Sequence, residues 1–358
     1  MKMQTTIEIN GRQIGPGLPV YVIAEMSANH GRDFGRAVDI VRAAKAAGAD
    51  AVKLQTFTPS GHTLKSDREF FRVGGGTSWD GRTLHDLYTE AAMPWEWQPR
   101  LFEVATTIGI DLFSAPVDAE SVDFLQQMGV PAYKIASFDM VDPQLVRRAA
   151  ETGKPVIIST GMASLAEIEE AVGAADDGGA TQVALLKCTS AYPAPIEEMN
   201  LRGIPHLQKV FGLPVGLSDH SQGMVASVAA VAMGACIIEK HFTLSRDIPG
   251  PDSGFSMEPG EFGDMVQGIR TVEAALGSAR YQLGEQERTG RMFRRSLFVV
   301  RDVCAGEQLT PDNVRSIRPD HGLHPRHLPD VIGRAASRDI PAGTPMSWLL
   351  ISEGGDAS

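Results

Sequence analysis

The stretch IIEKHFTLSRDIPGPDS, residues 237–253, and the shorter GLSDH, residues 216–220, decide the fold that this sequence predicts. In each, a short apolar run gives way to polar residues, as expected where a buried parallel strand ends at a solvent-facing mouth. A lone histidine is more often a capped or surface residue. Here His220 and His241 stand at the ends of successive strands beside carboxylates, which favours a shared divalent ion with positions left open for substrate.

Six further apolar runs bring the number of strand signals to eight, and helical patterns separate most of them. The eight runs cover residues 21–24, 51–54, 110–114, 131–137, 155–160, 183–190, 214–220 and 235–241. One helix is announced by a capping box, Ser164 followed by Glu167. This alternation predicts an α/β fold, a (β/α)8 barrel. A doubly wound open sheet would require a Gly-rich dinucleotide turn after the first strand, and AEMSANHG is not one.

The domain organisation follows from a change of character near Gly277. We expect a catalytic barrel over residues 1–280, a polar linker over 281–294 and a small, mainly-β domain over 295–358, where short β-like pieces are punctuated by Gly and Pro. The connection from residue 58 to residue 97 is far longer than the others. It predicts either a loop that covers the substrate or a disordered surface loop.

Charge and cysteine content limit the functional classes. Lys and Arg total 33 against 44 Asp and Glu, a net charge of −11, so no electrostatic footprint for nucleic acid or an anionic membrane is visible. No apolar run approaches the length of a membrane span, which is roughly 20 residues. The three scattered cysteines, Cys188, Cys236 and Cys304, suit small apolar fillers in a reducing compartment better than a disulfide framework. These features predict a cytoplasmic protein without nucleic-acid or membrane partners.

Two features of the strands predict charged groups inside the mouth. Lys53 lies within an apolar strand, where a lysine is costly unless it is paired or points into a site. Glu25 ends the first apolar run, which delivers it directly into the mouth. An isolated acidic residue is usually a solvated or salt-bridged surface group. The position of Glu25 makes it the exception.

Several blocks in one order resemble the sialic acid synthase family. They include YVIAEMSANHG, GADAVKLQTF, LLKCTSAYPAP, GLSDHS and IEKHFTLSRDIPGPDSGFSMEP, and the resemblance runs from about residue 18 to residue 350. The tail RRSLFVVRDVCAGEQLTPDNVRSIRP is similar to that family's antifreeze-like (SAF, β-clip) domain. The blocks SANH, WDGRTLHDLY, PWEW and TSAYPAP resemble the pseudaminic acid synthase branch more than the N-acetylneuraminate branch. The resemblance implies a TIM barrel followed by a SAF domain.

The resemblance also implies a reaction. Such enzymes condense phosphoenolpyruvate (PEP) with the open-chain aldehyde of an amino sugar and release phosphate. For this branch the sugar is 2,4-diacetamido-2,4,6-trideoxy-L-altrose and the product a nine-carbon nonulosonic acid. His220 and His241 match the metal ligands of the family, and their chemistry suits Mn2+, with Mg2+ or Co2+ as alternatives.

The family's other functional residues carry over by position. Those for the phosphate and carboxylate of PEP are Lys53, Lys134, Ser137, Ser159, Ser190 and Ser218, and those for proton transfer and the sugar are Glu25, Asp252, Asp139, Thr189, Tyr192 and Glu239. Ser190 stands where the neuraminate branch carries an amide, and Asp139 stands where a glutamate is expected. Arg318 matches the arginine that reaches the barrel of the neighbouring subunit, which implies a domain-swapped homodimer.

Three alternatives remain open from the sequence. An N-acetylneuraminate or legionaminate synthase would use an N-acetylmannosamine-type sugar at the same site. A metal-dependent barrel aldolase or epimerase would use the histidine pair without PEP. A non-catalytic carbohydrate-binding protein would need neither, and the in-strand lysines argue against it.

Overall fold

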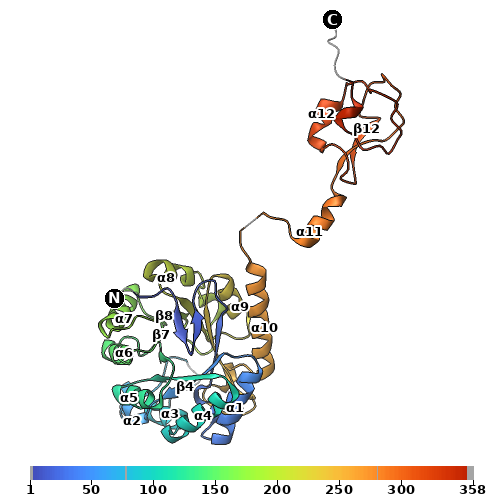
Figure 1. The fold of residues 1–358 in the computed structure, drawn as a ribbon. Helices are drawn as coiled ribbons and strands as arrows, with labels where there is room; N and C mark the ends of the chain where they lie inside the picture. Colours follow the sequence, from blue (N-terminus) through green and yellow to red (C-terminus); the bar gives the residue numbers. More distant parts are fainter. Residues whose placement is uncertain (1–2, 77–78, 280, 353–358) are drawn as a thin grey trace. The chain divides into compact units, whose positions relative to one another are not determined.

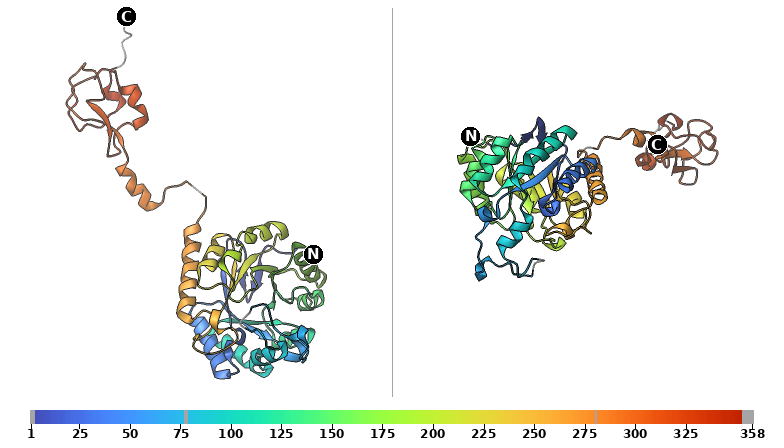
Figure 2. Two further views of the ribbon diagram at one scale, coloured as in Figure 1. Left: turned by 180° about the vertical axis from the view of Figure 1, so that it is seen from behind. Right: turned by 90° about the horizontal axis from the view of Figure 1, so that it is seen from below.

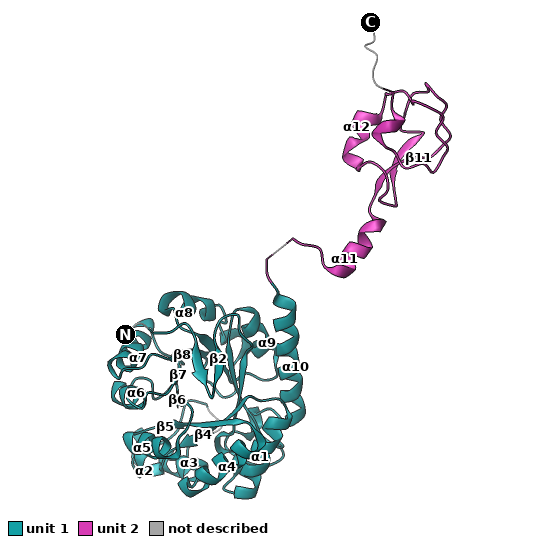
Figure 3. Ribbon diagram, in the orientation of Figure 1, with its two compact units in different colours: residues 1–277 teal, residues 278–358 magenta. Residues whose placement is uncertain are grey.

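The computed structural model of the chain describes residues 3–76, 79–279 and 281–352. It separates into two compact units, residues 1–277 and 278–358, shown in different colours in Figure 3. The expected end of the barrel domain, residue 280, and the last six residues of the expected second domain lie outside the described residues. Within the described ranges, every helix is too short or too polar to cross a membrane.

Unit 1 is a closed barrel of eight parallel strands with helices around it, which confirms the predicted TIM barrel (Figures 1 and 2). Neighbours around the ring run β10-β3-β4-β5-β6-β7-β8-β9. The strands are β3 (Tyr21–Glu25), β4 (Ala51–Thr56), β5 (Asp111–Pro116), β6 (Tyr133–Ile135), β7 (Val156–Ser159), β8 (Val183–Cys188), β9 (Val215–Asp219) and β10 (Ile237–His241). Each coincides with a predicted apolar run, because strands covered on both faces are apolar throughout.

The helices follow the strands in alternation. They are α1 (Phe34–Ala46), α2 (Pro59–His62), α3 (Leu84–Ala91), α4 (Gln98–Ile108), α5 (Ala119–Met128), α6 (Pro143–Ala150), α7 (Leu165–Asp177), α8 (Gly203–Phe211), α9 (Val225–Ala232) and α10 (Pro259–Leu276). The predicted capping box begins α7: the Ser164 backbone N–H donates to Glu167 Oε2 at 2.7 Å, and the Glu167 N–H donates to Ser164 Oγ at 3.3 Å. The long connection after β4 contains α2 and α3, and its residues line one side of a cavity at the barrel mouth, which agrees with a segment that covers the substrate rather than a disordered loop.

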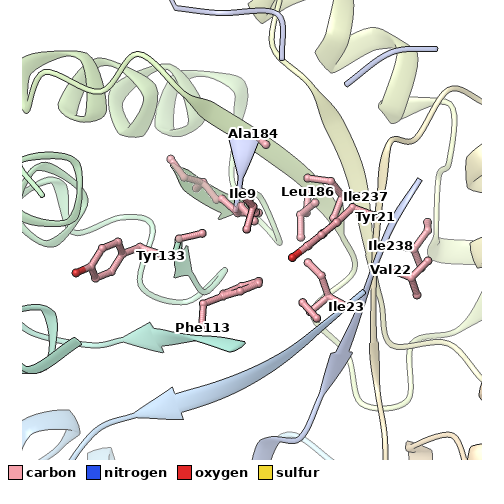
Figure 4. Packing of buried hydrophobic residues seen from close by; sticks show 14 of the residues in the cluster. Ile9, Tyr21, Val22, Ile23, Phe113, Tyr133, Ala184, Leu186, Ile237 and Ile238 are labelled. Carbon is pink, nitrogen blue, oxygen red and sulfur yellow. The ribbon is translucent and has the colours of Figure 1, made fainter. Parts of the chain in front are cut away.

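The barrel interior is a packed core rather than a pore. Figure 4 shows Tyr21, Ile23, Phe113, Leu186 and Ile237 converging on it, and all five are fully buried. These side chains come from four strands around the ring. The core therefore fixes the strand positions and, with them, the residues at the strand ends.

An N-terminal hairpin, absent from the sequence prediction, covers the strand-entry end of the barrel. It consists of β1 (Ile7–Ile9) and β2 (Arg12–Ile14), joined through Asn10 and Gly11 with φ angles of +47° and +80°. The Glu8 N–H donates to Gln182 just before β8, and Asn10 Nδ2 donates to Asp111 at the start of β5. The Asn-Gly pair between alternating isoleucines is a hairpin signal that could have predicted it.

Unit 2 has a small core of its own around the antiparallel pair β11 (Ser296–Val299) and β12 (Val314–Ile317). The short helix α12 (Leu328–Val331) packs against this pair through Val331, which joins the core with Leu297 and Met346. Part of the expected linker is helical, because α11 (Glu285–Gly290) and the 3-10 turn Arg291–Phe293 lie within it.

Candidate active site

Two buried lysines and two buried glutamates meet at the mouth end of the barrel. Lys53 Nζ on β4 lies 2.6 Å from Glu25 Oε2 on β3 and 3.5 Å from Glu239 Oε1 on β10. Lys134 Nζ on β6 lies 3.7 Å from the same Glu239 oxygen. All four side chains are at most 5% exposed. The in-strand lysines are therefore paired and face the site, as the sequence led us to expect.

Burial and mutual charge shift the pKa values of this cluster in different directions. Burial raises the pKa of Glu25 to about 7, against the opposing effect of Lys53. Burial acts to lower the pKa of Lys53, but the carboxylates of Glu239 and Glu25 outweigh it and raise that pKa. Burial lowers the pKa of Lys134, with Glu239 opposing. For Glu239, burial acts to raise the pKa, but Lys134 and Lys53 outweigh it and hold it low.

Serine hydroxyls at the ends of β7 and β9 and after β6 and β8 extend this charged cluster. Ser137 Oγ lies 2.7 Å from Ser190 Oγ, and Ser218 Oγ donates to Glu239 Oε1 at 3.4 Å. Ser159 Oγ is buried and has no hydrogen-bond partner among the described residues. Together with Lys134 these donors suit an acidic ligand, because charged and hydroxyl donors bind phosphate and carboxylate oxygens.

Gly161 lets the chain pass close to the serines. Its φ is +46°, and a Cβ there would lie 2.4 Å from Ser137 Cβ and 2.8 Å from Ser190 Oγ. Any larger residue would therefore push into the space where the two hydroxyls meet.

The two histidines stand side by side, with ring centroids 5.3 Å apart. His220 Nδ1 lies 3.1 Å from the Thr189 carbonyl, so an N–H there would leave Nε2 as the free ligand atom. His241 Nδ1 is buried and has no hydrogen-bond partner in the part of the chain that the structure describes. Burial and then the neighbouring His220 hold the pKa of His241 low, which keeps it in the neutral form that metals bind.

The histidine pair thus fits a divalent metal as an incomplete ligand set. Among the described residues, no cluster of three or more His, Cys, Asp or Glu could hold an ion without help. Water or substrate oxygens would have to complete the coordination, as in sites where the ion acts on a substrate. The Tyr192 ring, 4.3 Å from that of His220, packs beside the pair.

Asp252 comes to the site from the loop after β10. Its carboxylate accepts a hydrogen bond from the Ser27 hydroxyl and one from the Ala28 N–H at 3.4 Å. Ser27 adopts a left-handed backbone with φ +46°, which turns the chain after β3. Burial raises the pKa of Asp252, while the Ser27 hydrogen bond opposes that rise.

A cavity of about 350 Å³ opens above these residues. Its polar lining includes Lys53, His241, Asp252, Asp139 and Tyr192 from the predicted set. Burial raises the pKa of Asp139 to about 6, with Lys134 opposing. The other wall of the cavity comes from the segment after β4 and from the ends of β5 and β6.

Thr189 adjoins the site through its backbone carbonyl on His220, and Arg318 belongs to unit 2. The Thr189 hydroxyl donates to the Glu198 carbonyl at 3.3 Å and accepts from Lys187, and the residue is not part of the cavity lining. Arg318 is an exposed residue of unit 2, where it borders a shallow hollow with Arg294, Arg295 and His324. Its expected role in a partner's barrel stays a prediction.

The sequence prediction missed several residues at the site. Gln55 and Ser27 line the cavity; Gln55 directly follows a predicted strand and Ser27 comes three residues after one, which was a usable signal. Cys188 Sγ lies 3.7 Å from His220 Nδ1. Burial acts to raise the pKa of Cys188, but the contact with His220 outweighs it and lowers that pKa to about 7. Cys304 is exposed, so the expectation that all three cysteines are buried fillers is wrong for that one.

The fold and these strand-end residues together define a class: a TIM barrel whose mouth carries buried lysines and serine hydroxyls beside a pair of metal-type histidines. The chain belongs to the NeuB family, whose model matches residues 40–281, and the model of the SAF domain matches residues 294–351.

Known relatives agree with this assignment over most of the chain. It is 45% identical to the pseudaminic acid synthase of Campylobacter jejuni, across 90% of this chain and 94% of the relative. It is 41% identical to the pseudaminic acid synthase of Helicobacter pylori, across 92% and 97%. The structure is similar to that of an N-acetylneuraminic acid synthetase from Leptospira borgpetersenii, with a TM-score of 0.72 and 31% identity across 81% of this chain and 96% of that one.

Proposed function

We propose that the chain acts as a pseudaminic acid synthase. It condenses PEP with the open-chain aldehyde of 2,4-diacetamido-2,4,6-trideoxy-L-altrose and releases phosphate, giving a nine-carbon nonulosonic acid. The observation that carries the proposal is the pair of buried lysines at the barrel mouth, where Lys53 and Lys134 lie on the same Glu239 oxygen and Lys53 also borders the cavity beside His241. An aldolase or epimerase acting on a sugar alone has no need of this anion-binding set.

PEP binds at the lysines and serines. Lys53 and Lys134 supply the positive charge for its phosphate and carboxylate, and Ser137, Ser159, Ser190 and Ser218 donate hydroxyl hydrogen bonds. The unpartnered Ser159 hydroxyl supports this role, because a buried donor without a partner is otherwise a cost of about 1–3 kcal/mol.

His220 and His241 would hold the metal, with Mn2+ the first choice and Mg2+ or Co2+ possible. A divalent ion bound there supplies a Lewis acid for the aldehyde oxygen. The π electrons between C2 and C3 of PEP form the new bond to the aldehyde carbon, and the aldehyde oxygen takes up the C=O electron pair and a proton from water. Tyr192 packs against both rings, with centroid distances of 4.3 and 6.1 Å, and keeps them in place.

Glu25 serves as the base for the second half of the reaction. Carbon–carbon bond formation leaves C2 of PEP electron-poor, and a water adds there as its proton passes to the Glu25 carboxylate. Collapse of the resulting centre breaks the C2–O bond and expels phosphate. Asp252, Asp139, Glu239 and Tyr192 orient the sugar, and Thr189 contributes through its carbonyl to His220.

The choice of sugar rests on relatedness. The chain is 45% identical to a pseudaminic acid synthase and 31% identical to an N-acetylneuraminic acid synthetase, each over most of its length. The alternative within the family is a neuraminate or legionaminate synthase that uses an N-acetylmannosamine-type sugar.

Phosphate release from PEP tests the proposal. We expect release with the 2,4-diacetamido sugar and Mn2+, none without the sugar, and loss of activity on adding EDTA. N-acetylmannosamine should give a kcat/KM at least about tenfold lower. No release with either sugar contradicts the synthase proposal, and equal or better use of N-acetylmannosamine contradicts the choice of sugar.

The proposed assembly of two chains rests on the resemblance of the C-terminal tail to the SAF domain of the family. We infer that two chains form a domain-swapped homodimer in which Arg318 of each reaches the barrel of the other and binds the acyl group of the sugar. The use of PEP, a metabolite of the cytoplasm, supports a cytoplasmic location.

A further inference from the structure

Six apolar side chains line one side of the cavity, and the rings of His62 and Tyr88 lie among them. Phe57 follows β4, Ala115 and Val117 stand at the end of β5, and α3 contributes three more residues. We call this set the apolar wall: Phe57, Leu84, Leu87, Ala91, Ala115 and Val117. Phe57, Leu87 and Ala115 are only 4–7% exposed although they border the cavity.

The β5 part of the apolar wall lies across the mouth from His220. In the ring of eight strands, β5 is four places from β9, which leads into His220, and is therefore opposite to it. Figure 1 shows α3 at the edge of the barrel away from α8 and α9, the helices on either side of β9. A ligand that begins at the histidines and crosses the cavity ends at this wall.

Local contacts hold the apolar wall in place. The Trp95 Nε1–H donates to the Phe57 carbonyl at 3.2 Å, and the Phe57 ring packs against His62 and Tyr88 with centroid distances of 5.2 and 5.8 Å. The His62 and Tyr88 rings in turn lie 4.3 Å apart. The wall is therefore preformed, with two aromatic rings packed on Phe57.

We propose that the apolar wall is the subsite for the C6 methyl group of a 6-deoxy sugar. This inference rests on the proposed function, which places the aldehyde carbon, C1, at the histidines and so sends C6 across the cavity. A methyl group against these six side chains is buried among carbon atoms, whereas a C6 hydroxyl there would lose its water without gaining a partner from any of them. The wall thus selects 6-deoxy amino sugars over their 6-hydroxy counterparts.

The preference for the 6-deoxy sugar, measured as a ratio of kcat/KM values, has an expected upper limit. An apolar pocket rejects a substrate that merely adds a hydroxyl by up to about a hundredfold in kcat/KM. We therefore expect a ratio of about 10 to 100 between two sugars that differ only at C6, namely 2,4-diacetamido-2,4,6-trideoxy-L-altrose and its 6-hydroxy analogue.

Val117→Thr tests the wall with almost no change of volume. The added hydroxyl offers a partner to a C6 hydroxyl, so the ratio should fall about five- to tenfold, mainly through a lower KM for the 6-hydroxy sugar. The matched control is Val210→Thr, the same change at a half-exposed position on α8. It should leave the ratio unchanged. Ala115→Ser provides a second wall variant if Val117→Thr does not fold.

Three outcomes of these measurements would overturn the subsite. Equal kcat/KM for the two sugars in the unaltered protein overturns the subsite but leaves the proposed function standing. Turnover of neither sugar overturns the proposed function and this inference with it. A wall variant that folds, judged by its melting temperature, and lowers both kcat/KM values equally shows that the residue has only a structural role, which also overturns the subsite.

Discussion

Glu25 is held between two opposing influences at the end of β3. Burial favours its neutral form and brings its pKa to about 7, whereas the Lys53 ammonium 2.6 Å away favours the carboxylate. A base with a pKa near the working pH combines a useful ionised fraction with good proton affinity. This balance is the reason that Glu25, rather than the lower-pKa Glu239, is assigned the proton transfer.

The pKa of Glu25 predicts a pH dependence. The base acts in its ionised form, and its folded-state pKa is raised, so the ionised fraction falls as the pH drops through about 7. We expect kcat/KM for PEP to fall about tenfold per pH unit below about 7. The measurement is a pH profile of phosphate release from pH 5.5 to 8.5.

Two controls show whether Glu25 causes the fall in kcat/KM below pH 7, which we call the acid limb of the profile. Protonation of the histidines would also reduce activity, but by competing with metal, so raising the metal concentration tenfold would move a histidine limb and not a Glu25 limb. Asp139, whose pKa burial raises to about 6, is tested by Asp139→Asn, which should leave the limb near 7. A profile that is flat down to pH 5.5, or one that moves with metal, would rule out Glu25.

Lys53→Ala separates the synthase from barrel enzymes that do not use PEP. Loss of this ammonium should lower kcat/KM for PEP at least about 100-fold, the usual effect of removing one preorganised charge from an anion site. Lys154→Ala, at an exposed position just before β7, is the control and should retain activity. Activity of Lys53→Ala within threefold of the unaltered protein would contradict the role given to this residue.

At the scale of elements, β9 and β10 are joined by an ion pair beside the histidines. Lys240 Nζ lies 3.0 Å from Asp219 Oδ2, and both side chains are at most 1% exposed. Asp219 also accepts hydrogen bonds from the hydroxyls of Ser221 and Ser227. Asp219 and Lys240 directly follow Ser218 and Glu239 along their strands. Because successive side chains of a strand point to opposite faces, the ion pair lies on the face away from these two site residues.

Lys240→Met should therefore be strongly destabilising. It leaves the buried Asp219 carboxylate without its cation, and breaking a buried pair in this way costs about 3–5 kcal/mol. The free energy of unfolding in urea at pH 7 measures the effect. Lys209→Met, at an exposed position on α8, is the matched control. A change below 1 kcal/mol for Lys240→Met, as for a surface site, would contradict this account.

The elements also show how much of the fold and of the site could be predicted from the sequence. The eight strands could be predicted because each is apolar on both faces, and the cap of α7 because its contacts are local. Lys53 was informative because charge inside a strand requires a partner. The apolar wall could not be predicted, since Leu87 on α3 and Val117 after β5 border one cavity only once the chain is folded.

For the whole molecule, the assignment of Arg318 to a partner's barrel can be tested by mixing two inactive variants. Lys53→Ala removes the anion site of one chain, and Arg318→Ala removes the arginine of the other. In a domain-swapped dimer, the barrel of the Arg318→Ala chain receives an intact arginine from the Lys53→Ala chain. Mixing after gentle dissociation should therefore restore a substantial part of the activity.

The mixing experiment can also contradict the shared site. If Arg318 serves the barrel of its own chain, no mixed dimer has a complete site and activity stays at the level of the separate variants. Light scattering on each sample reports whether the chains form dimers at all, and a monomeric active protein would also exclude the shared site.

The central claim is that this barrel joins PEP to a sugar aldehyde and breaks the C2–O bond of PEP. It is tested most directly with PEP that carries 18O in the oxygen between C2 and phosphorus, incubated with Mn2+ and the 2,4-diacetamido sugar. Attack of water at C2 requires the label to leave with the phosphate, where 31P NMR detects it. Phosphate that contains no label, or phosphate formed without a nine-carbon product, would contradict the account.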